Sequence, residues 1–117
     1  MRVAVSSEGV KLHSTTKEGN GKQPKKGQTV TMHYVCANAV TGEVYDSSVA
    51  KNRPFKFKLG TGQVIKGWDI GVAQMTLGQK AKLTCAPEFA YGSQGAGNVI
   101  PGNTTLCFDV ELLAIDD

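Results

Sequence analysis

Three aromatic residues in the central part of the sequence stand beside turn or loop signals, where their rings can line a site as well as fill a core. These residues are Tyr45, Trp68 and Tyr91. Tyr45 is followed directly by Asp46, so a ring and a carboxylate lie next to each other in the chain. Rings at the ends of elements, with a few polar atoms at the lip, are typical of a concave small-ligand site. The pattern therefore predicts an apolar ligand pocket.

Trp68 has two interpretations. A lone tryptophan on a helix that faces a sheet is more often a core residue than a platform for a ligand. Here it stands at the expected start of a helix, directly after Gly67, where backbone N–H groups have no partner within the helix and are available to a ligand carbonyl. The indole can serve both purposes.

Two other kinds of chemistry have weaker signals. Ser47 and Ser48 could join His13 or His33 in a hydrolase triad, because triads assemble in space, but the Gly-x-Ser-x-Gly elbow is absent. The glycines of residues 92–97 are similar to a phosphate-binding loop only loosely, since neither a lysine nor a helix start follows them. Both interpretations are disfavoured by the sequence.

Length and composition indicate one folded domain over residues 1–117. A chain of 117 residues buries enough surface to fold without metals or disulfides. Its 40% apolar and 20% charged residues are ordinary for a globular protein, and the net charge of +3 is mild. The lysines are spread over several elements, so we expect no nucleic-acid partner; a basic β domain for nucleic acid is the disfavoured alternative.

The sequence lacks the signals of a membrane protein and of a disulfide-linked or metal-binding protein. The sequence has no apolar run of the length, about 18 residues, that a membrane span needs, and its N-terminal residues contain no long apolar stretch. Cys36, Cys85 and Cys107 are odd in number and far apart, which favours reduced structural thiols over a disulfide framework or a metal site. We therefore expect a cytoplasmic protein with no membrane, metal or cofactor requirement. The sequence has no helical tails or added repeats, so we expect a monomer.

The elements that must position the pocket are mostly short alternating runs separated by glycines, which indicate an antiparallel sheet. In one run Phe55, Phe57 and Leu59 face inward, and in the last run Cys107 faces outward as the thiol nearest to solvent. The expected strands are residues 10–13, 29–37, 43–46, 55–59, 80–85 and 105–115.

One helix and one long loop complete the expected fold. The apolar spacing of Ile65, Trp68, Val72 and Met75 predicts a helix that Gly78 ends in a left-handed conformation. Residues 86–104 form a connection that is longer than folding requires and more typical of a binding loop, whose apolar members should be shielded from water. The predicted class is α+β, a five- or six-stranded antiparallel half-barrel sheet wrapped around one short helix.

The order and spacing of seven short motifs are similar to those of one known family, over roughly residues 8–115. The motifs occupy residues 45–48, 54–60, 64–68, 71–75, 78–83, 90–92 and 108–113. In these segments the chain resembles the FKBP-type peptidyl-prolyl cis-trans isomerases, which bind the macrolides tacrolimus and rapamycin. The resemblance implies isomerase activity on X-Pro bonds, with proline-containing peptides and proteins as substrates.

The resemblance also implies the residues of the site. Trp68 would be the floor of the pocket, with the Ile65 N–H and the Tyr91 hydroxyl as hydrogen-bond donors. The implied catalytic residues are Asp46, Tyr91, Trp68, Ile65 and Phe108. The implied substrate or macrolide contacts are Tyr34, Tyr45, Phe55, Gln63, Val64, Ile65, Trp68, Ala90, Tyr91, Val99, Ile100 and Phe108.

The sequence departs from the family pattern at several of these positions. Tyr45 stands where phenylalanine is usual, and its added hydroxyl needs a partner. Lys51 aligns with an arginine that is often paired with the aspartate, and an ammonium lacks the planar fork of a guanidinium. Gln63 replaces a common glutamate, and Ala96 and Gly102 differ from frequent residues of the long loop.

The expected mechanism needs no nucleophile. The barrier to peptide rotation is about 18–20 kcal/mol because resonance is lost at the twisted midpoint. The planar amide is more polar than the twisted one, so removal of water raises the free energy of the planar ground state relative to the twisted transition state. A ring-lined cavity supplies that environment.

The alternative function is a non-catalytic module in which the same cavity binds a proline-containing partner or presents a macrolide.

Overall fold

The computed structural model describes residues 9–117, which form six strands, one α-helix and two short 3-10 segments. The strands are β1 (Val10–Lys17), β2 (Thr29–Asn38), β3 (Val44–Ser47), β4 (Phe55–Lys58), β5 (Lys80–Cys85) and β6 (Leu106–Asp116). The helical segments are α1 (Lys66–Gly71), η1 (Val72–Gln74) and η2 (Pro87–Phe89).

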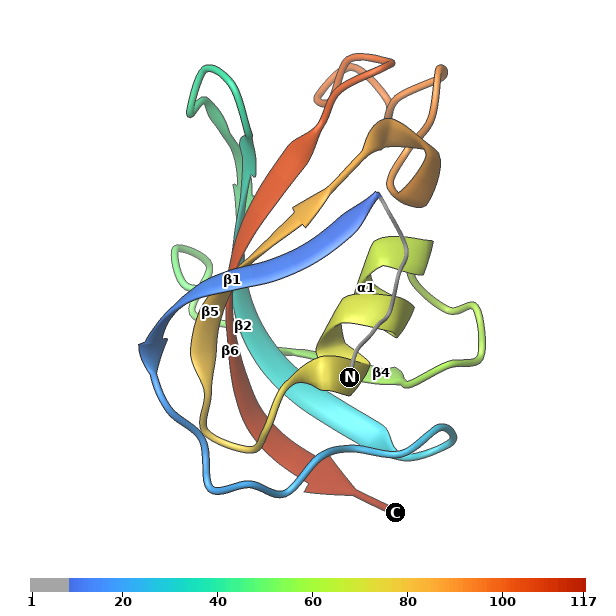
Figure 1. The fold of residues 1–117 in the computed structure, drawn as a ribbon. Helices are drawn as coiled ribbons and strands as arrows, with labels where there is room; N and C mark the ends of the chain where they lie inside the picture. The colour runs from blue at the N-terminus through green and yellow to red at the C-terminus, as the bar shows by residue number, and fades with distance from the viewer. Residues whose placement is uncertain (1–8) are drawn as a thin grey trace.

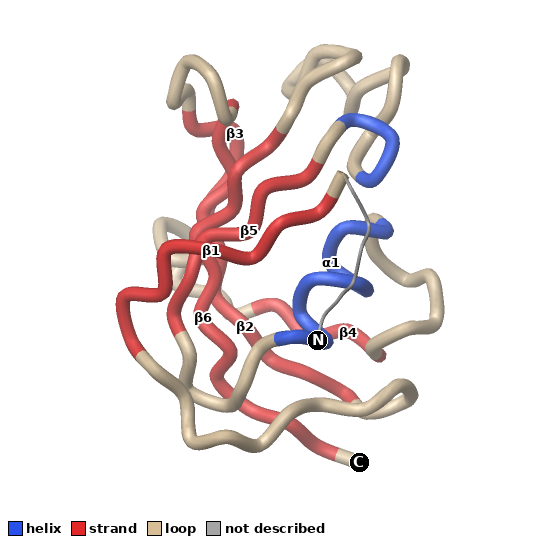
Figure 2. Tube along the Cα trace, viewed as in Figure 1, coloured by secondary structure: helices blue, strands red, loops and turns tan. Residues whose placement is uncertain are grey.

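The strands form one antiparallel sheet in the order β1-β5-β6-β2-β3, and β4 pairs with the other end of β2. β2 is central because both short strands pair with it: Val30 lies opposite Phe57 of β4, and Cys36 lies opposite Asp46 of β3. The sheet is curved and α1 lies on its concave side (Figures 1 and 2). The predicted α+β class, with an antiparallel sheet wrapped around one short helix, is confirmed.

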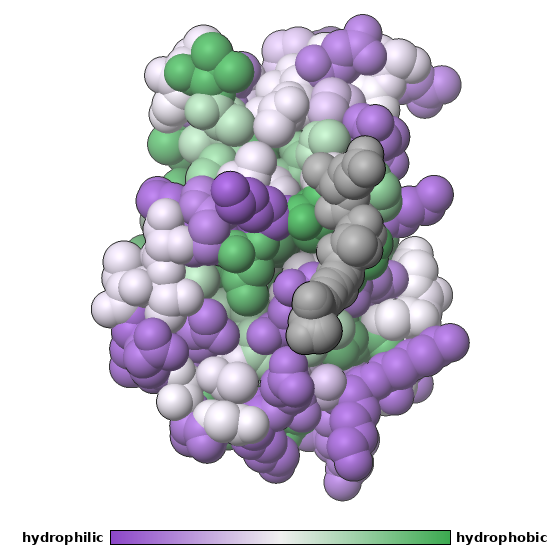
Figure 3. Space-filling view, viewed as in Figure 1, coloured by the Kyte–Doolittle hydropathy of each residue, from purple (hydrophilic) through white to green (hydrophobic). Residues whose placement is uncertain are grey.

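The core lies between the concave face of the sheet and α1. Alternation along β6 places Leu106, Phe108, Val110 and Leu112 inward with at most 2% of their surface exposed, while Asp109 points to solvent. Burial of each such large side chain stabilises the fold by about 1.5–3 kcal/mol. Polar side chains cover much of the surface in Figure 3, with apolar surface at the tip of the β2–β3 hairpin, where Val40 is 88% exposed.

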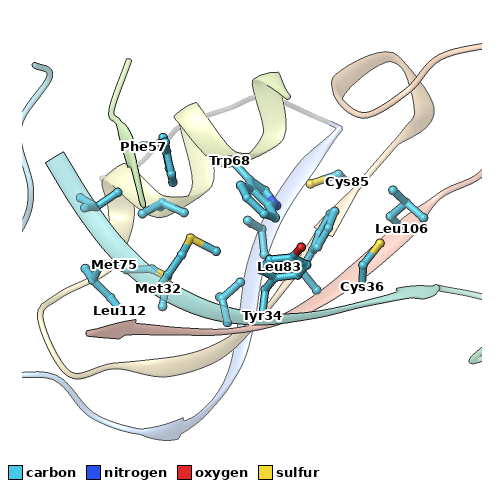
Figure 4. Packing of buried hydrophobic residues seen from close by; sticks show 14 of the residues in the cluster. Met32, Tyr34, Cys36, Phe57, Trp68, Met75, Leu83, Cys85, Leu106 and Leu112 are labelled. Carbon is cyan, nitrogen blue, oxygen red and sulfur yellow. The ribbon is translucent and has the colours of Figure 1, made fainter. Parts of the chain in front are cut away.

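The helix approaches β5 closely because two glycines lie at the contact. A Cβ added to Gly67 would overlap the Cys85 side chain, and one added to Gly71 would overlap Leu83. Figure 4 shows the sulfur of Cys85 beside α1, with Trp68 directed from the helix toward the sheet. Glycine lowers the intrinsic stability of a helix by about 1 kcal/mol per residue, so α1 depends on this packing.

The helix is shorter than the apolar stripe predicted, and its end was predicted at the wrong residue. The α-helix ends at Gly71, η1 continues to Gln74, and Met75 is already extended. Gly78 has the left-handed conformation expected, with φ +90°, but it lies in the turn that leads into β5. Trp68, Val72 and Met75 of the stripe remain buried, because a 3-10 turn also returns a side chain to the same face after three residues, while Ile65 is partly buried.

β1 is longer than expected and irregular. The strand continues to Lys17, but its register with β5 shifts between His13 and Lys17. Ser14 has a positive φ of 54° at this point, which identifies a local bulge in the edge strand. The sequence signal ended at residue 13 because a bulge interrupts the alternation by which strands are predicted.

The connection between β5 and β6 contains η2 and several tight turns, and it rises beyond one end of the sheet (orange in Figure 1). Ile100 is buried at 7% exposure, as expected for an apolar loop residue. Val99 is 58% exposed, so the expectation that all apolar members of this loop are shielded from water is wrong. Val99 lies in a tight turn in which its N–H donates to the Ala96 carbonyl. The Val99 side chain is directed outward from this turn.

The three cysteines differ in environment as predicted. Cys36 and Cys85 are buried, and burial raises the pKa of each thiol to about 12. Cys107 is partly exposed on the outer face of β6. It is the thiol nearest to solvent.

We expect the exchange of Gly67 for alanine to destabilise the protein, because the new methyl group collides with Cys85. Overpacking of this kind costs about 1–3 kcal/mol, more than the gain of about 1 kcal/mol in helix propensity. Urea unfolding of Gly67→Ala, Cys85→Ala and the double variant measures the effect. The double variant should lose less than the sum of the single losses, because Cys85→Ala removes the colliding sulfur. Additive losses would show that the helix does not touch β5 at this point.

Candidate functional site

The floor of the candidate site is the indole of Trp68 in the first turn of α1, only 7% exposed. Four other rings surround it. Their centroids lie 5.0 Å (Tyr34), 5.3 Å (Phe108), 5.6 Å (Phe55) and 5.9 Å (Phe57) from that of Trp68. Aromatic pairs at such distances and tilted angles attract one another beyond simple burial, so the indole is held in one orientation.

A cavity of about 410 Å³ opens above this floor. Its volume lies within the range of small-ligand sites. The residues that line it are Tyr34, Phe55, Gln63, Val64, Ile65, Trp68 and Tyr91. All seven are among the contacts implied by the sequence resemblance, and they come from β2, β4, the segment before α1, α1 itself and the long loop. Phe55 is 38% exposed, more than Phe57 or Leu59, because its ring borders this opening and not the closed core.

The other implied residues lie outside this lining. Phe108 is 1% exposed beneath Trp68, so it supports the floor from below. Ile100 is buried, and Val99 faces solvent. Ala90 and Tyr45 are partly buried and pack against the core cluster. The structure thus separates a ring-lined hollow from a set of residues behind and around it.

The Asp46 carboxylate lies behind the cavity wall and has three partners. It accepts hydrogen bonds from the Tyr34 hydroxyl at 2.6 Å and from the Ser47 N–H at 2.8 Å. Lys51 Nζ lies 3.0 Å from Oδ1, the oxygen that Tyr34 does not use. The Tyr34 hydrogen bond, followed by those from Lys51 and Ser47, lowers the pKa of Asp46 despite its partial burial. Desolvation and the same carboxylate raise the pKa of Tyr34, so this hydroxyl keeps its proton at neutral pH.

Two polar groups at the cavity can serve as donors. Ile65 precedes the first helical residue of α1, and its carbonyl accepts from Trp68 and Asp69. Among the described residues, no group accepts a hydrogen bond from the Ile65 N–H. The Tyr91 side chain is 40% exposed, and burial of part of its ring raises the pKa of its hydroxyl. Both groups are therefore able to donate to a ligand at neutral pH.

Asp69, which the sequence analysis did not single out, and Gln63 shape the approach to Ile65. Asp69 accepts hydrogen bonds from the N–H groups of Gly60 and Gly62 at 2.8 and 3.0 Å, which fixes the turn before α1. The Gln63 side chain accepts from the Lys58 N–H at 2.9 Å, so it is occupied by the backbone of β4. An acidic residue in the first turn of a helix after a Gly-x-Gly turn was the available signal for Asp69.

The hydroxyl of Tyr45 has found a partner in the β2–β3 hairpin. Asn38 Nδ2 donates to it at 3.2 Å, while Asn38 Oδ1 accepts from the N–H groups of Val40 and Thr41. One amide side chain therefore connects the hairpin turn to the Tyr45 ring. The sequence indicated that the hydroxyl needs a partner and contained no sign of which residue supplies it.

Of the serines considered for a hydrolase triad, the structure brings Ser48 to a histidine, but not as a hydrolase would. Ser48 Oγ lies 2.8 Å from His33 Nδ1 and also accepts from the Tyr34 N–H at 2.7 Å. Ser48 is only 1% exposed, so no substrate carbonyl can reach its oxygen. The pair ties the segment after β3 to β2.

Two further findings concern the described residues. No group of three His, Cys, Asp or Glu side chains within residues 9–117 is arranged to hold a metal ion. No helix in this part of the chain has the length and apolar character to cross a bilayer.

Comparison with known proteins gives the family. The model of the FKBP-type peptidyl-prolyl cis-trans isomerases matches residues 20–113. A peptidyl-prolyl cis-trans isomerase FKBP1A from Xenopus laevis is 53% identical over 109 residues, which cover 92% of this chain and 99% of that protein. FK506-binding protein 1 from Rhizopus delemar is 56% identical over 103 residues, 87% of this chain and 94% of the relative. The peptidyl-prolyl cis-trans isomerase Fkbp12 from Drosophila melanogaster is 56% identical over 93 residues, 80% of this chain and 85% of the relative. With its curved antiparallel sheet, its ring-walled cavity and these matches over most of its length, the chain belongs to the FKBP-type peptidyl-prolyl cis-trans isomerase family.

Proposed function

We propose that this isomerase rotates X-Pro bonds in the cavity above Trp68. The observation that carries the proposal is a hollow of about 410 Å³ walled by aromatic rings, with an N–H group at the entry of α1 that no described residue uses. A prolyl ring is apolar and fits such walls, and the carbonyl of a substrate can accept from the Ile65 N–H. No nucleophile takes part in this chemistry.

The physical basis of the acceleration is the low polarity of the cavity. Rotation about an X-Pro bond takes tens of seconds or longer without a catalyst because the planar amide is resonance-stabilised. The Trp68 Nε1 atom is fully shielded and has no hydrogen-bond partner among the described residues, so the floor presents the apolar part of the indole to a ligand. A polar planar amide loses solvation in such surroundings, and the less polar twisted amide loses less. Each reduction of the barrier by about 1.4 kcal/mol increases the rate tenfold.

The residues divide into three roles. Trp68 and Phe55 hold the prolyl ring, Phe108 supports Trp68 from below, and Tyr45 packs behind the lining. The Ile65 N–H anchors a substrate carbonyl. Asp46 and Tyr91 set the electric field around the rotating amide, Asp46 from behind Tyr34 and Tyr91 from the cavity wall.

The residue before proline lies against the long loop in this proposal. Val99 is 58% exposed, and Tyr91 of the same loop lines the cavity, so the loop can present an apolar side chain to a bound peptide. A substrate with an apolar residue before proline would cover Val99 on binding. This contact gives the site a preference for Leu-Pro over Glu-Pro bonds.

Macrolide binding in the same cavity belongs to the proposal. The Rhizopus delemar relative carries the name FK506-binding protein 1, and tacrolimus and rapamycin both suit an apolar hollow with one N–H donor. Val64, Gln63 and Ala90 would contribute to macrolide contacts together with the rings.

The chain would act as a monomeric single domain in the cytoplasm.

We expect the protein to accelerate the isomerisation of a Leu-Pro peptide in a protease-coupled assay, and rapamycin to abolish the acceleration. Trp68→Ala should lower kcat/KM at least about tenfold, which corresponds to about 1.4 kcal/mol of lost transition-state stabilisation. An amide NMR spectrum of the variant serves as the control for folding. Exchange NMR that detects peptide binding without faster exchange would instead establish the non-catalytic binding module.

The pKa of Asp46 provides a second test. Its folded-state pKa is lowered mainly by the Tyr34 hydrogen bond, so Tyr34→Phe should raise it more than Lys51→Met does. Because the folded pKa is depressed, the stabilisation by Asp46 is present above the unfolded value of about 3.9 and is lost as the pH falls through the folded pKa. Carboxyl-carbon NMR titration measures the shift. A larger effect of Lys51→Met would show that the ammonium, and not the Tyr34 hydroxyl, is the main partner of the carboxylate.

The third test concerns the residue before proline. Wild-type protein should isomerise Leu-Pro faster than Glu-Pro peptides, and Val99→Ser should reduce the ratio of their kcat/KM values about two- to fivefold, because part of a buried apolar contact is lost. Val40→Ser is the matched control, since Val40 is also an exposed valine in a loop but lies in the β2–β3 hairpin. Equal ratios in wild type and Val99→Ser would remove the loop from substrate selection.

A further inference from the structure

A second cavity, of about 490 Å³, lies on the convex face of the sheet. We call it the back-face groove. Its lining includes Val35, Val49, Lys80, Lys82, Asp109 and Glu111, which come from β2, the β3–β4 connection, β5 and β6. The Trp68 cavity does not share any lining residue with it.

The groove and the Trp68 cavity lie on opposite sides of the same strand. Tyr34 points into the Trp68 cavity, whereas its neighbours His33 and Val35 line the groove. Successive strand residues face opposite sides of a sheet, so the two hollows are separated by its thickness. In Figure 1 the β3–β4 connection (light green, left) lies on the side of the sheet away from α1.

Two irregular features raise the walls of the groove above a flat sheet face. On one side β1 bulges at Ser14, which lines the groove, where the register with β5 shifts. On the other side the β3–β4 connection is fastened to β2, because Ser48 N donates to the Tyr34 carbonyl at 2.9 Å and Ser48 Oγ bonds to His33. This attachment places Val49, 56% exposed, beside the convex face of β2.

The charges of the groove leave one lysine without a partner. Lys82 Nζ lies 2.7 Å from Asp109, and Lys17 Nζ lies 3.9 Å from Glu111. Lys80 is exposed, and within residues 9–117 no carboxylate oxygen lies within the 4.0 Å of an ion pair with it. With Lys17 included, three lysines surround two carboxylates, so the excess charge is positive, and Lys80 lies across from Glu111 in the sheet without forming an ion pair with it.

The apolar part of the groove lies across the sheet from this lysine. Lys80 pairs with Glu111, which pairs with His33 on β2, and Val35 follows two residues along the same face. Val35 and Val49 give this end an apolar surface, and the hydroxyls of Ser14 and Thr16 lie near the lysine end on β1. A ligand that spans the groove would meet a cation at one end, cross the Asp109 and Glu111 positions of β6, and meet branched aliphatic side chains at the other end.

We propose that the back-face groove binds a small organic carboxylate that carries an aromatic or branched apolar body. The carboxylate takes a charge-assisted hydrogen bond from Lys80, and the apolar body covers Val35 and Val49. The volume of the groove suffices for a ligand of this size. Neither the isomerase reaction nor macrolide binding uses this site.

The test is a titration of the ¹⁵N-labelled protein with 4-phenylbutyrate, followed by amide chemical shifts. We expect saturable shifts centred on Thr16, Val49, Lys82 and Asp109, with a dissociation constant on the order of 1 mM. The neutral analogue 4-phenylbutanamide is the matched ligand control and should bind more weakly. No shifts at these amides, or saturable shifts only around Trp68, overturn the proposal.

Variants separate the two halves of the site. Lys80→Met and Val49→Asp should each weaken the binding of 4-phenylbutyrate about three- to tenfold, the first by removing the cation and the second by adding a repelling carboxylate. Lys56→Met and Val40→Asp are the matched controls, because Lys56 and Val40 are exposed and lie outside the groove. Both controls should bind like the wild type. Equal affinity of Lys80→Met and wild type overturns the role assigned to the cation.

Discussion

The close contact between α1 and β5 determines where every group of the candidate site stands. At Gly67 and Gly71 there is no side chain between the helix backbone and the sheet, so the helix lies deep within the curve of the strands. Trp68, between these glycines, is thereby brought within 5–6 Å of rings from three strands. The same position of the helix places Ile65, whose N–H has no partner among the described residues, in the lining of the cavity. A larger residue at either glycine would move the floor and the donor together.

The sequence predicts the regular part of this fold well and its irregular part poorly, for a physical reason. Alternation in β2, β5 and β6 reflects burial of one face, and such a face must be apolar whatever its neighbours are. The end of α1 has no such signal, because a 3-10 turn buries Val72 as an α-turn would. The bulge at Ser14 is set by the pairing of β1 with β5, which short-range patterns do not contain. Hence the alternation predicts β1 too short, and the apolar stripe predicts the helix too long.

In the candidate site, too, some features could be predicted from the sequence and others could not. The rings could be predicted because aromatic residues beside turns are uncommon in a purely structural role. The cavity does unite seven of the residues implied by the family resemblance. The support of the site escaped prediction: Asp69 and Asn38 act by hydrogen bonds to turn backbones that only the folded chain brings near. Val99 was expected to be shielded, but the turn conformation of its loop, not its hydrophobicity, decides that it faces outward.

The Ser48 hydroxyl connects residues that face opposite sides of the sheet. Its hydroxyl carries a single hydrogen and lies within reach of both His33 Nδ1 and the Tyr34 carbonyl, at 2.8 and 3.2 Å. When His33 Nδ1 lacks a proton, the hydroxyl can donate to it; when that nitrogen is protonated, it donates to Ser48 and the hydroxyl turns to the carbonyl. The tautomer of this imidazole therefore sets the polarisation of the peptide groups that carry Tyr34, and Tyr34 in turn holds the Asp46 carboxylate. One hydroxyl thus connects an imidazole on the convex face to the peptide groups of a residue whose ring lines the cavity on the concave face.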